Sequence, residues 1–191
     1  MCGRYSVGDE EKSVEMKQVI ETLTRKVGAE KIAKIKTSGD VCPTDLAPVL
    51  VGTKVAAMQW GFTQNDGKLV INARSESAGV RQMFKRSFAE MRCLIPAALY
   101  YEWWKHDGNS HRCSFSSERG MIYMAGIYRF EPDAKQPRFT ILTREAAPGI
   151  SFVHNRMPVI LDGDARREWL LGDDPVRTIS RAMMDVRLRM A

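Results

Sequence analysis

Apolar residues recur at helical spacing in four stretches of the chain. The first, Asp9–Val27, starts at a residue that can cap a helix and is followed by Gly28, which favours a helix end. The second covers residues 77–92, and the third covers residues 164–171 and precedes a glycine. The fourth, 175–190, has a proline in its first turn, where a helix tolerates proline. The pattern therefore predicts four helices, two of them near the C-terminus.

Short runs rich in β-branched and aromatic residues lie between these stretches and predict strands. The runs cover residues 46–51, 54–60, 69–71, 94–104, 121–130 and 138–143. Turn signals at Gly52-Thr53 and at residues 107–109 separate neighbouring runs, which favours antiparallel pairing over repeated strand–helix–strand units. We therefore predict an α+β fold in a single domain over residues 1–191, built on an antiparallel, barrel-like sheet with flanking helices.

Composition narrows the class of protein. Of 191 residues, 44% are hydrophobic and 27% are charged, which is typical of a folded protein and excludes a disordered chain. No apolar run reaches the ~18 residues of a membrane helix, and the start of the chain lacks the apolar stretch of a secretory signal. We therefore expect a cytoplasmic protein with no membrane partner.

Charge and cysteine content add two expectations. The formal net charge of +6 favours an anionic partner such as nucleic acid, although charge alone does not identify one. The four cysteines are too few and too scattered for a disulfide framework, so we expect thiols. A zinc site built from Cys93, His106, His111 and Cys113 would lack any paired Cys-x-x-Cys, so we expect no metal and no cofactor.

Three tripeptides place a polar or reactive residue two positions before an arginine. They are Cys2-Gly3-Arg4, Asn72-Ala73-Arg74 and His154-Asn155-Arg156. Because alternate residues of an extended chain project to the same face, each segment would present its first residue beside its arginine. Together they would form a pocket for an anion next to a reaction centre. The alternative is chance, because arginine is abundant in this chain.

Cys2 gives these segments a specific chemistry. Removal of Met1 would leave a free α-amine, with a pKa of ~7.7–8.0, beside a thiol with a pKa of ~8.5. Such a 1,2-aminothiol forms an imine with an aldehyde and then closes its sulfur onto the same carbon, which gives a thiazolidine. The alternative is that Cys2 is merely a small residue after the start codon.

Three further polar residues could support this chemistry. Glu102 lies among aromatic side chains, where desolvation would raise its pKa and suit it to proton transfer. His154 has a side chain that titrates near neutral pH, and Asn72 could orient a hydroxyl or carbonyl group. The structural alternatives are an exposed edge-strand glutamate, a hydrogen-bonded histidine and a turn asparagine.

Two tryptophans are candidates for contact with nucleobases. Trp60 ends one strand-like run, and Trp103 lies beside Glu102 in another. A base stacked on such a ring contributes ~1–3 kcal/mol to binding. The alternative for either ring is packing in the core.

Seven motifs, in order along nearly the whole chain, are similar to those of the SOS response-associated peptidase (SRAP) family. They are Cys2-Gly3-Arg4-Tyr5, Pro43-Thr44, Trp60-Gly61, Asn72-Ala73-Arg74-Ser75-Glu76, residues 92–96, Tyr101-Glu102-Trp103 and His154-Asn155-Arg156-Met157-Pro158. Members of this family are abasic-site sensors that bind single-stranded DNA and trap the ring-opened sugar as a thiazolidine on the N-terminal cysteine. They also carry a debated peptidase label linked to removal of the initiator methionine.

The resemblance implies roles for individual residues. Cys2 would be the crosslinking nucleophile, with Asn72, Glu102 and His154 as the other catalytic residues. The implied DNA-binding residues are Arg4, Pro43, Trp60, Arg74, Trp103 and Arg156. The implied partner is single-stranded DNA with an abasic site, including sites at a junction between single-stranded and duplex DNA. The protein would bind it as a monomer and associate with the nucleoid after DNA damage.

The sequence departs from the family pattern at two places. Residues 62–64, after Trp60-Gly61, and residues 98–100, before the Tyr101-Glu102-Trp103 motif, both differ from the more usual residues. Both departures lie beside the implied DNA path, so they affect the expected binding geometry more than the chemistry. The two other readings of the chain are an N-terminal-nucleophile cysteine peptidase or amidase, with His154 as the base, and a DNA-binding module without catalysis.

Overall fold

Five strands close into a ring in the computed structural model, which describes residues 2–8, 13–132 and 134–190. They are β3 (Leu46–Val51), β4 (Lys54–Trp60), β8 (Arg92–Ala97), β11 (Ile122–Arg129) and β12 (Arg138–Glu145). Three short strands extend this sheet to eight: β7 (Asn72–Arg74), β13 (Arg156–Pro158) and β14 (Ile160–Leu161). The α+β fold with a ring-like sheet is confirmed. However, β12 pairs in parallel with both β4 and β7, which the turn signals do not predict.

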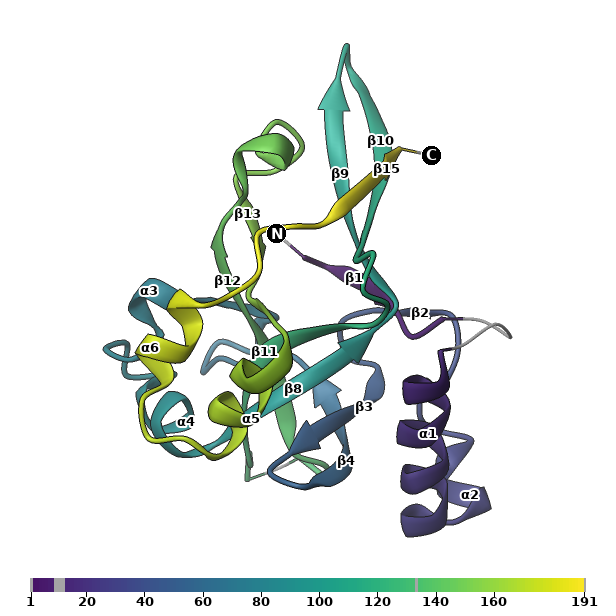
Figure 1. Ribbon diagram of the computed structural model, residues 1–191. Coiled ribbons are helices and arrows are strands. Elements are labelled where there is room, and N and C mark those ends of the chain that lie inside the picture. The colour runs from purple at the N-terminus through teal and green to yellow at the C-terminus, as the bar shows by residue number, and fades with distance from the viewer. Residues whose placement is uncertain (1, 9–12, 133, 191) are drawn as a thin grey trace.

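A second sheet carries the start of the chain. It contains, in spatial order, β15 (Arg187–Met190), β10 (Asn109–Ser116), β9 (Leu99–His106), β1 (Arg4–Ser6) and β2 (Asp40–Val41). The β9–β10 hairpin projects from the body of the molecule, next to the hairpin formed by β12 and β13, and the N-terminal strand lies between them (Figure 1). A third sheet has only β5 (Phe62–Thr63) and β6 (Leu69–Val70).

The helices cover two sides of the strands. On one side are α1 (Val14–Val27) and α2 (Ala29–Ile32), and on the other are α3 (Ser75–Ala78), α4 (Lys85–Glu90), α5 (Gly163–Leu171) and α6 (Pro175–Ser180) (Figure 1). A 3-10 turn, η1 (Pro148–Ile150), lies between β12 and β13. None of the helices in the described ranges is both long and apolar enough to cross a membrane.

Aromatic packing holds the two sheets together. The Trp60 ring stacks on Phe139 with centroids 6.2 Å apart, and lies 5.3 Å from the ring of Tyr5 in β1. Its indole Nε1 donates a hydrogen bond to the carbonyl oxygen of Ile71 at 2.9 Å. Burial of such rings is among the largest favourable contributions to folding. The packing of Tyr5 on Trp60 therefore fixes β1, and with it the start of the chain, against the ring of strands.

Two of the four predicted helices are confirmed. Helix α1 ends before Gly28, which has a φ of 81°, and α5 ends before Gly172. Asp9, the predicted cap of the first helix, lies outside the described residues. Instead, Ser13 caps α1 by accepting a hydrogen bond from the Met16 amide at 3.2 Å.

The other two predicted helices are wrong in part. Residues 77–92 contain only the end of α3 and the whole of α4 instead of one helix, and the loop between the two exposes Val80 while Phe84 packs in the core. Residues 175–190 are helical only to Ser180, and the last described residues form β15 instead. The segment from residue 186 to residue 190 alternates apolar residues with arginines, which is strand spacing. Pairing with β10 also satisfies the backbone groups of an otherwise open sheet edge.

The predicted strands agree more closely with the structure. The runs 46–51 and 54–60 coincide with β3 and β4, and the turn between them has Gly52 at a φ of 55°. The run 94–104 covers two consecutive strands, β8 and β9, which belong to different sheets. The change of sheet at this point places Glu102 beside the N-terminus.

Candidate active site

The backbone of Cys2 is held at the start of β1. Strand β1 pairs with β9, with Arg4 opposite Tyr101, so the chain that precedes Arg4 runs beside Glu102. The side-chain Nδ2 of Asn72 in β7 donates a hydrogen bond to the carbonyl oxygen of Cys2 at 2.8 Å. Residues separated by 70 positions in the chain are thus joined directly, and the position of Cys2 is fixed from two sides.

The thiol of Cys2 is buried and electrostatically disfavoured as a thiolate. Its side chain is 1% exposed, and its Sγ lies 3.8 Å from the carbonyl oxygen of Arg4. Burial, followed by the nearby carboxylate of Glu102, raises the pKa of the thiol well above its ordinary value. At neutral pH the sulfur is therefore protonated and lies within electrostatic reach of a carboxylate.

Glu102 is a buried carboxylate on the inner face of β9. It is 4% exposed, and burial raises the pKa of its side chain above the ordinary value. The positive charge of the amino terminus opposes this shift. A carboxyl group with a raised pKa holds a proton more readily than an ordinary carboxylate, which favours a part in proton transfer.

His154 lies between η1 and β13 with one ring nitrogen already occupied. Its Nδ1 accepts a hydrogen bond from the backbone N–H of Arg156 at 2.9 Å, so the neutral ring carries its proton on Nε2. Burial and then the charge of the amino terminus lower the pKa of His154. The same terminal charge acts on Glu102, so the structure gathers Cys2, Asn72, Glu102 and His154 around the start of the chain.

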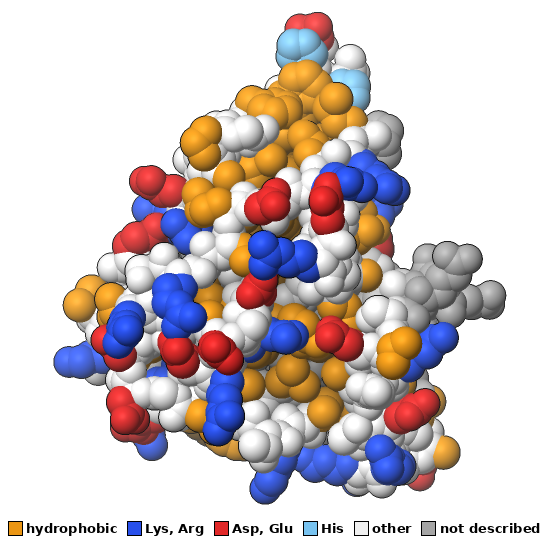
Figure 2. Space-filling model, in the orientation of Figure 1, with side chains coloured by type: hydrophobic (Ala, Val, Ile, Leu, Met, Phe, Trp, Pro, Cys, Tyr) orange, Lys and Arg blue, Asp and Glu red, His pale blue; other side chains and the backbone are white. Residues whose placement is uncertain are grey.

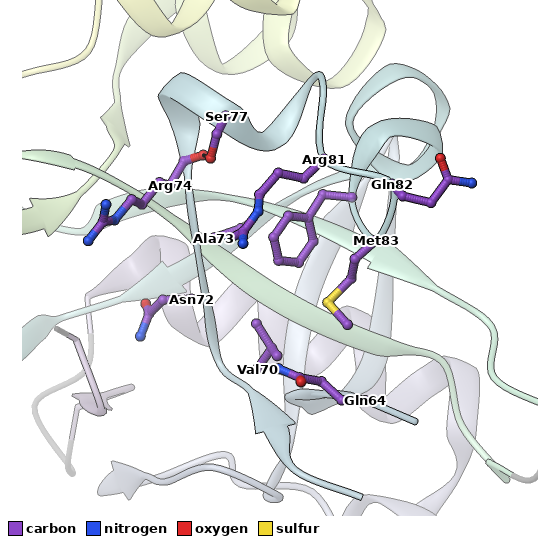
Figure 3. Close-up of a pocket in the computed structure, with 10 residues that line it drawn as sticks. Gln64, Val70, Asn72, Ala73, Arg74, Ser77, Arg81, Gln82 and Met83 are labelled. Atoms are coloured by element: carbon purple, nitrogen blue, oxygen red, sulfur yellow. Dashed lines mark hydrogen bonds between the residues drawn. The ribbon is translucent and has the colours of Figure 1, made fainter. Parts of the chain in front are cut away.

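A large cavity with both polar and apolar lining residues opens beside Asn72. Its volume is about 880 Å³, and no acidic side chain is among the described residues that line it. Figure 3 shows Asn72 and Arg74 projecting from β7 on one side, and Arg81, Gln82 and Met83 on the other side of that strand. Sequence reasoning missed Arg81, because the predicted helix 77–92 includes it; its signal is a basic residue two positions after Gly79. The cavity is wide and positively charged where it meets the site.

Arg4 and Trp103 lie on the other face of the second sheet. Consecutive strand residues point to opposite faces, so Trp103 faces away from the side occupied by Glu102. The guanidinium of Arg4 lies over the Trp103 ring at 5.5 Å and forms an ion pair with Asp40 at 3.7 Å. Pro43 is half-buried in the turn after β2. These residues form a surface next to the site rather than its lining.

Arg156 has a strong partner within the chain. Its two terminal nitrogens each lie 2.8 Å from an oxygen of Glu76, and one also donates to the carbonyl oxygen of Thr143 at 2.6 Å. The Arg156 guanidinium is therefore paired within the chain in this conformation, and its contact with a DNA phosphate stays a prediction. In the sequence Glu76 is only the last residue of the motif that begins at Asn72, and its pairing with Arg156 follows from the folded chain alone.

Trp60 does not reach any surface. It is 0% exposed and is packed against Tyr5 and Phe139 inside the ring of strands. Its expected position on a DNA path is therefore corrected, because a base could stack on it only if the core opened. Among the described residues, no group of three or more His, Cys, Asp or Glu side chains is arranged to hold a metal ion.

Comparison with known proteins identifies relatives of this chain. The chain is 33% identical over 117 residues to Abasic site processing protein YoaM from Bacillus subtilis, an alignment that covers 58% of this chain and 51% of that protein. It is 32% identical over 117 residues to Abasic site processing protein YedK from Escherichia coli, covering 58% and 52% of the two chains. The chain thus spans about half the length of the curated relatives it matches.

Solved structures share the fold at lower identity. An X-ray structure of a protein from Bacteroides thetaiotaomicron has a TM-score of 0.79 at 17% identity, covering 99% of this chain and 91% of that chain. The family model for SOS response associated peptidase (SRAP) matches residues 1–188. Because this match spans nearly the whole sequence, the chain belongs to the SRAP family.

Proposed function

We propose that this protein processes abasic sites by binding single-stranded DNA and joining its N-terminal cysteine to the ring-opened sugar. The relatives YoaM and YedK are named abasic site processing proteins, which supports the substrate class. The observation that carries the proposal is the grouping of a buried Cys2 with Glu102, Asn72 and His154 beside a basic cavity.

The reaction that we propose is a condensation. After removal of Met1, the α-amine of Cys2 adds to the aldehyde carbon of the opened deoxyribose, and the carbonyl oxygen leaves as water to give an imine. The thiol then adds to the imine carbon, and its proton is transferred to the nitrogen. One N–C and one S–C bond form, the C=O bond is lost, and no oxidant or reductant is needed.

Each site residue has a defined part in this reaction. Asn72 holds the carbonyl of Cys2, so that nitrogen and sulfur face one carbon. Glu102, with its raised pKa, accepts a proton from the thiol as the ring closes. His154 donates from Nε2 to an oxygen of the sugar, because its Nδ1 is occupied by the Arg156 amide. Arg74 and Arg81 attract the phosphates along the cavity.

The peptidase alternative has less support from the same geometry. A cysteine peptidase needs a thiolate, with a lowered pKa and a basic nitrogen beside it. Burial raises the pKa of Cys2, and the unprotonated nitrogen of His154, Nδ1, already accepts a hydrogen bond from the Arg156 amide instead of facing the thiol as a base. An amine-first reaction avoids both difficulties, because the sulfur reacts only after the imine has formed.

The test is adduct formation with a single-stranded oligonucleotide that carries one abasic site. We expect a heat-stable adduct whose mass equals protein plus DNA minus one water, formed by protein that begins at Cys2 and not by protein that retains Met1. Cys2→Ala should form none. Cys2→Ser is the matched control, because it keeps a side chain of similar size with a hydroxyl in place of the thiol. Both variants keep the amine, so either should give an adduct that survives heating only after reduction of the imine. A full yield of heat-stable adduct with Cys2→Ala, or peptide cleavage without any adduct, would contradict the proposal.

A further inference from the structure

The two segments that carry Glu102 and His154 each carry an aromatic ring two residues away. On β9 this is Trp104, which lies on the same face as Glu102 because side chains alternate along a strand. In the segment after η1 it is Phe152, two residues before His154. The rings of Trp104 and Phe152 contact each other edge to face, with centroids 5.6 Å apart and planes at 88°.

Two histidines complete this group. His106 stacks on Trp104 with centroids 4.4 Å apart and an interplanar angle of 12°, and His111, opposite Trp104 on β10, lies 5.8 Å away. We name these four residues, Trp104, His106, His111 and Phe152, the hairpin aromatic cluster. Asp107, in the turn at the hairpin tip, lies 3.3 Å from His106 Nε2 and is the charged group paired with the cluster.

The hairpin aromatic cluster lies at the margin of the core, against which Trp104 packs, and part of it is open to solvent. Phe152 is 52% exposed, and His106 is exposed as well. Figure 2 shows apolar side chains gathered on the upper part of the visible face, over the two hairpins, while charged side chains are concentrated below. Packing between the two hairpins explains why the Phe152 ring contacts Trp104. It does not explain why apolar ring surface in the cluster is left exposed. Exposed aromatic patches of this kind mark binding surfaces.

The position of the cluster relative to the site indicates its ligand. A strand rises by ~3.3 Å per residue, so Trp104 lies ~7 Å along β9 from Glu102. Nucleotides in a stacked strand are ~3.4 Å apart, so this offset corresponds to about two base steps. An abasic nucleotide has no base of its own, so the rings that could reach the cluster belong to its neighbours. Aromatic side chains stack with any nucleobase, because every base has a π face.

We propose that the hairpin aromatic cluster stacks against a nucleobase one or two nucleotides from the abasic site. This inference rests on the proposed function, since it assumes that the abasic sugar is bound at Cys2. Stacking on Trp104 and Phe152 selects single-stranded DNA with intact bases beside the lesion and holds the sugar next to Glu102 and His154. It is tolerant of base identity, because it uses ring faces rather than hydrogen bonds.

The test uses an unreactive tetrahydrofuran analogue of the abasic site, with binding followed by fluorescence anisotropy. One oligonucleotide has ordinary bases on both sides of the analogue, and a second has analogues at the three positions on each side. We expect the unchanged protein to prefer the first by roughly 5- to 100-fold. Trp104→Leu and Phe152→Leu should lose most of this preference, and Trp104→Phe should retain part of it.

Phe130 provides the matched control. It is 73% exposed, packs edge to face on Tyr128, and directly follows Arg129, which pairs with the first residue of β12, Arg138, and not with the part of β12 that pairs with β13. Phe130→Leu should keep the full preference for flanking bases. 2-Aminopurine placed next to the analogue should be quenched on binding by the unchanged protein and less so by Trp104→Leu. Because Phe152 is exposed, its variant keeps the test valid even if Trp104→Leu folds poorly.

Three results would overturn the inference. One is an undiminished preference for flanking bases in both leucine variants. Another is an equal loss in Phe130→Leu. The third is self-association of the unchanged protein that the leucine variants abolish, which would make the cluster a contact between copies. Failure of the proposed function is separate, because it would appear as an absence of Cys2-dependent adduct in the unchanged protein with reactive abasic DNA.

Discussion

The ion pair between Arg156 and Glu76 connects β13 to α3 at the edge of the site, and Glu76→Gln should weaken the fold measurably. The substitution keeps the shape and one oxygen acceptor but removes the negative charge. Arg156 is then left with an uncompensated guanidinium whose side chain is only 11% exposed. It retains the hydrogen bond to the Thr143 carbonyl oxygen at 2.6 Å.

The size of the effect follows from the burial of the two partners. Breaking a fully buried pair costs ~3–5 kcal/mol, whereas an exposed pair contributes ~0–1 kcal/mol. Glu76 is 52% exposed, so the pair lies between these limits despite its two 2.8 Å contacts. We expect a loss of about 1–2 kcal/mol in the free energy of unfolding, or about 2–8 °C in melting temperature.

The loss should depend on pH with a defined sign. The hydrogen bond from Arg156 lowers the pKa of Glu76 below its ordinary value. A carboxylate with a depressed pKa in the folded state stabilises the fold above its unfolded pKa of ~4.3, and this contribution disappears as the pH falls through the folded value. The difference between the parent protein and Glu76→Gln should therefore be complete at pH 7 and shrink below pH ~4.

Urea unfolding followed by circular dichroism at several pH values measures this difference. The control is Glu90→Gln on α4, which breaks an exposed pair with Arg86 at 3.3 Å and should cost at most ~0.5 kcal/mol. Equal effects of Glu76→Gln and Glu90→Gln at pH 7 would refute the reasoning. So would a Glu76→Gln effect that is unchanged at acid pH.

Three further outcomes are expected. Glu102→Gln should slow adduct formation while DNA binding stays near normal. Because burial raises the pKa of Glu102, the same substitution should also raise the free energy of unfolding in urea above pH ~4. Below pH ~4 it should leave that free energy unchanged. A stability loss at neutral pH would contradict this. Arg74→Ala should reduce the slope of log DNA affinity against log salt concentration by about one phosphate contact. The control Arg25→Ala, in the last turn of α1, should leave this slope unchanged. Equal slopes in the two variants would show that Arg74 does not contact DNA. Trp60→Ala should lower the free energy of unfolding, measured by heat or urea, by ~3–5 kcal/mol, and Trp103→Ala should lower it much less. A larger loss in Trp103→Ala would contradict the burial of Trp60.

Local chemistry in the sequence determined much of the fold. The runs that became β3 and β4 contain their own alternation and their own turn glycine, so neighbouring residues alone specify them. Helix α1 likewise ends at a glycine visible in the sequence. The last residues of the chain show the limit of such reasoning. Their apolar residues fit both helical and strand spacing, and they form a strand because they pair with the edge of β10.

The sequence by itself determined the chemical groups of the site: a cysteine at position 2, a carboxylate among aromatic residues, and an asparagine and a histidine near arginines. Only the tertiary structure decided which of these groups meet. It paired Arg156 with Glu76, turned Trp60 into the core and joined Asn72 to the backbone of Cys2. Residue types and local spacing follow from covalent neighbours, whereas burial and pairing depend on contacts between segments tens of residues apart. For this reason the reactive groups could be predicted from the chain, and their partners required the folded molecule.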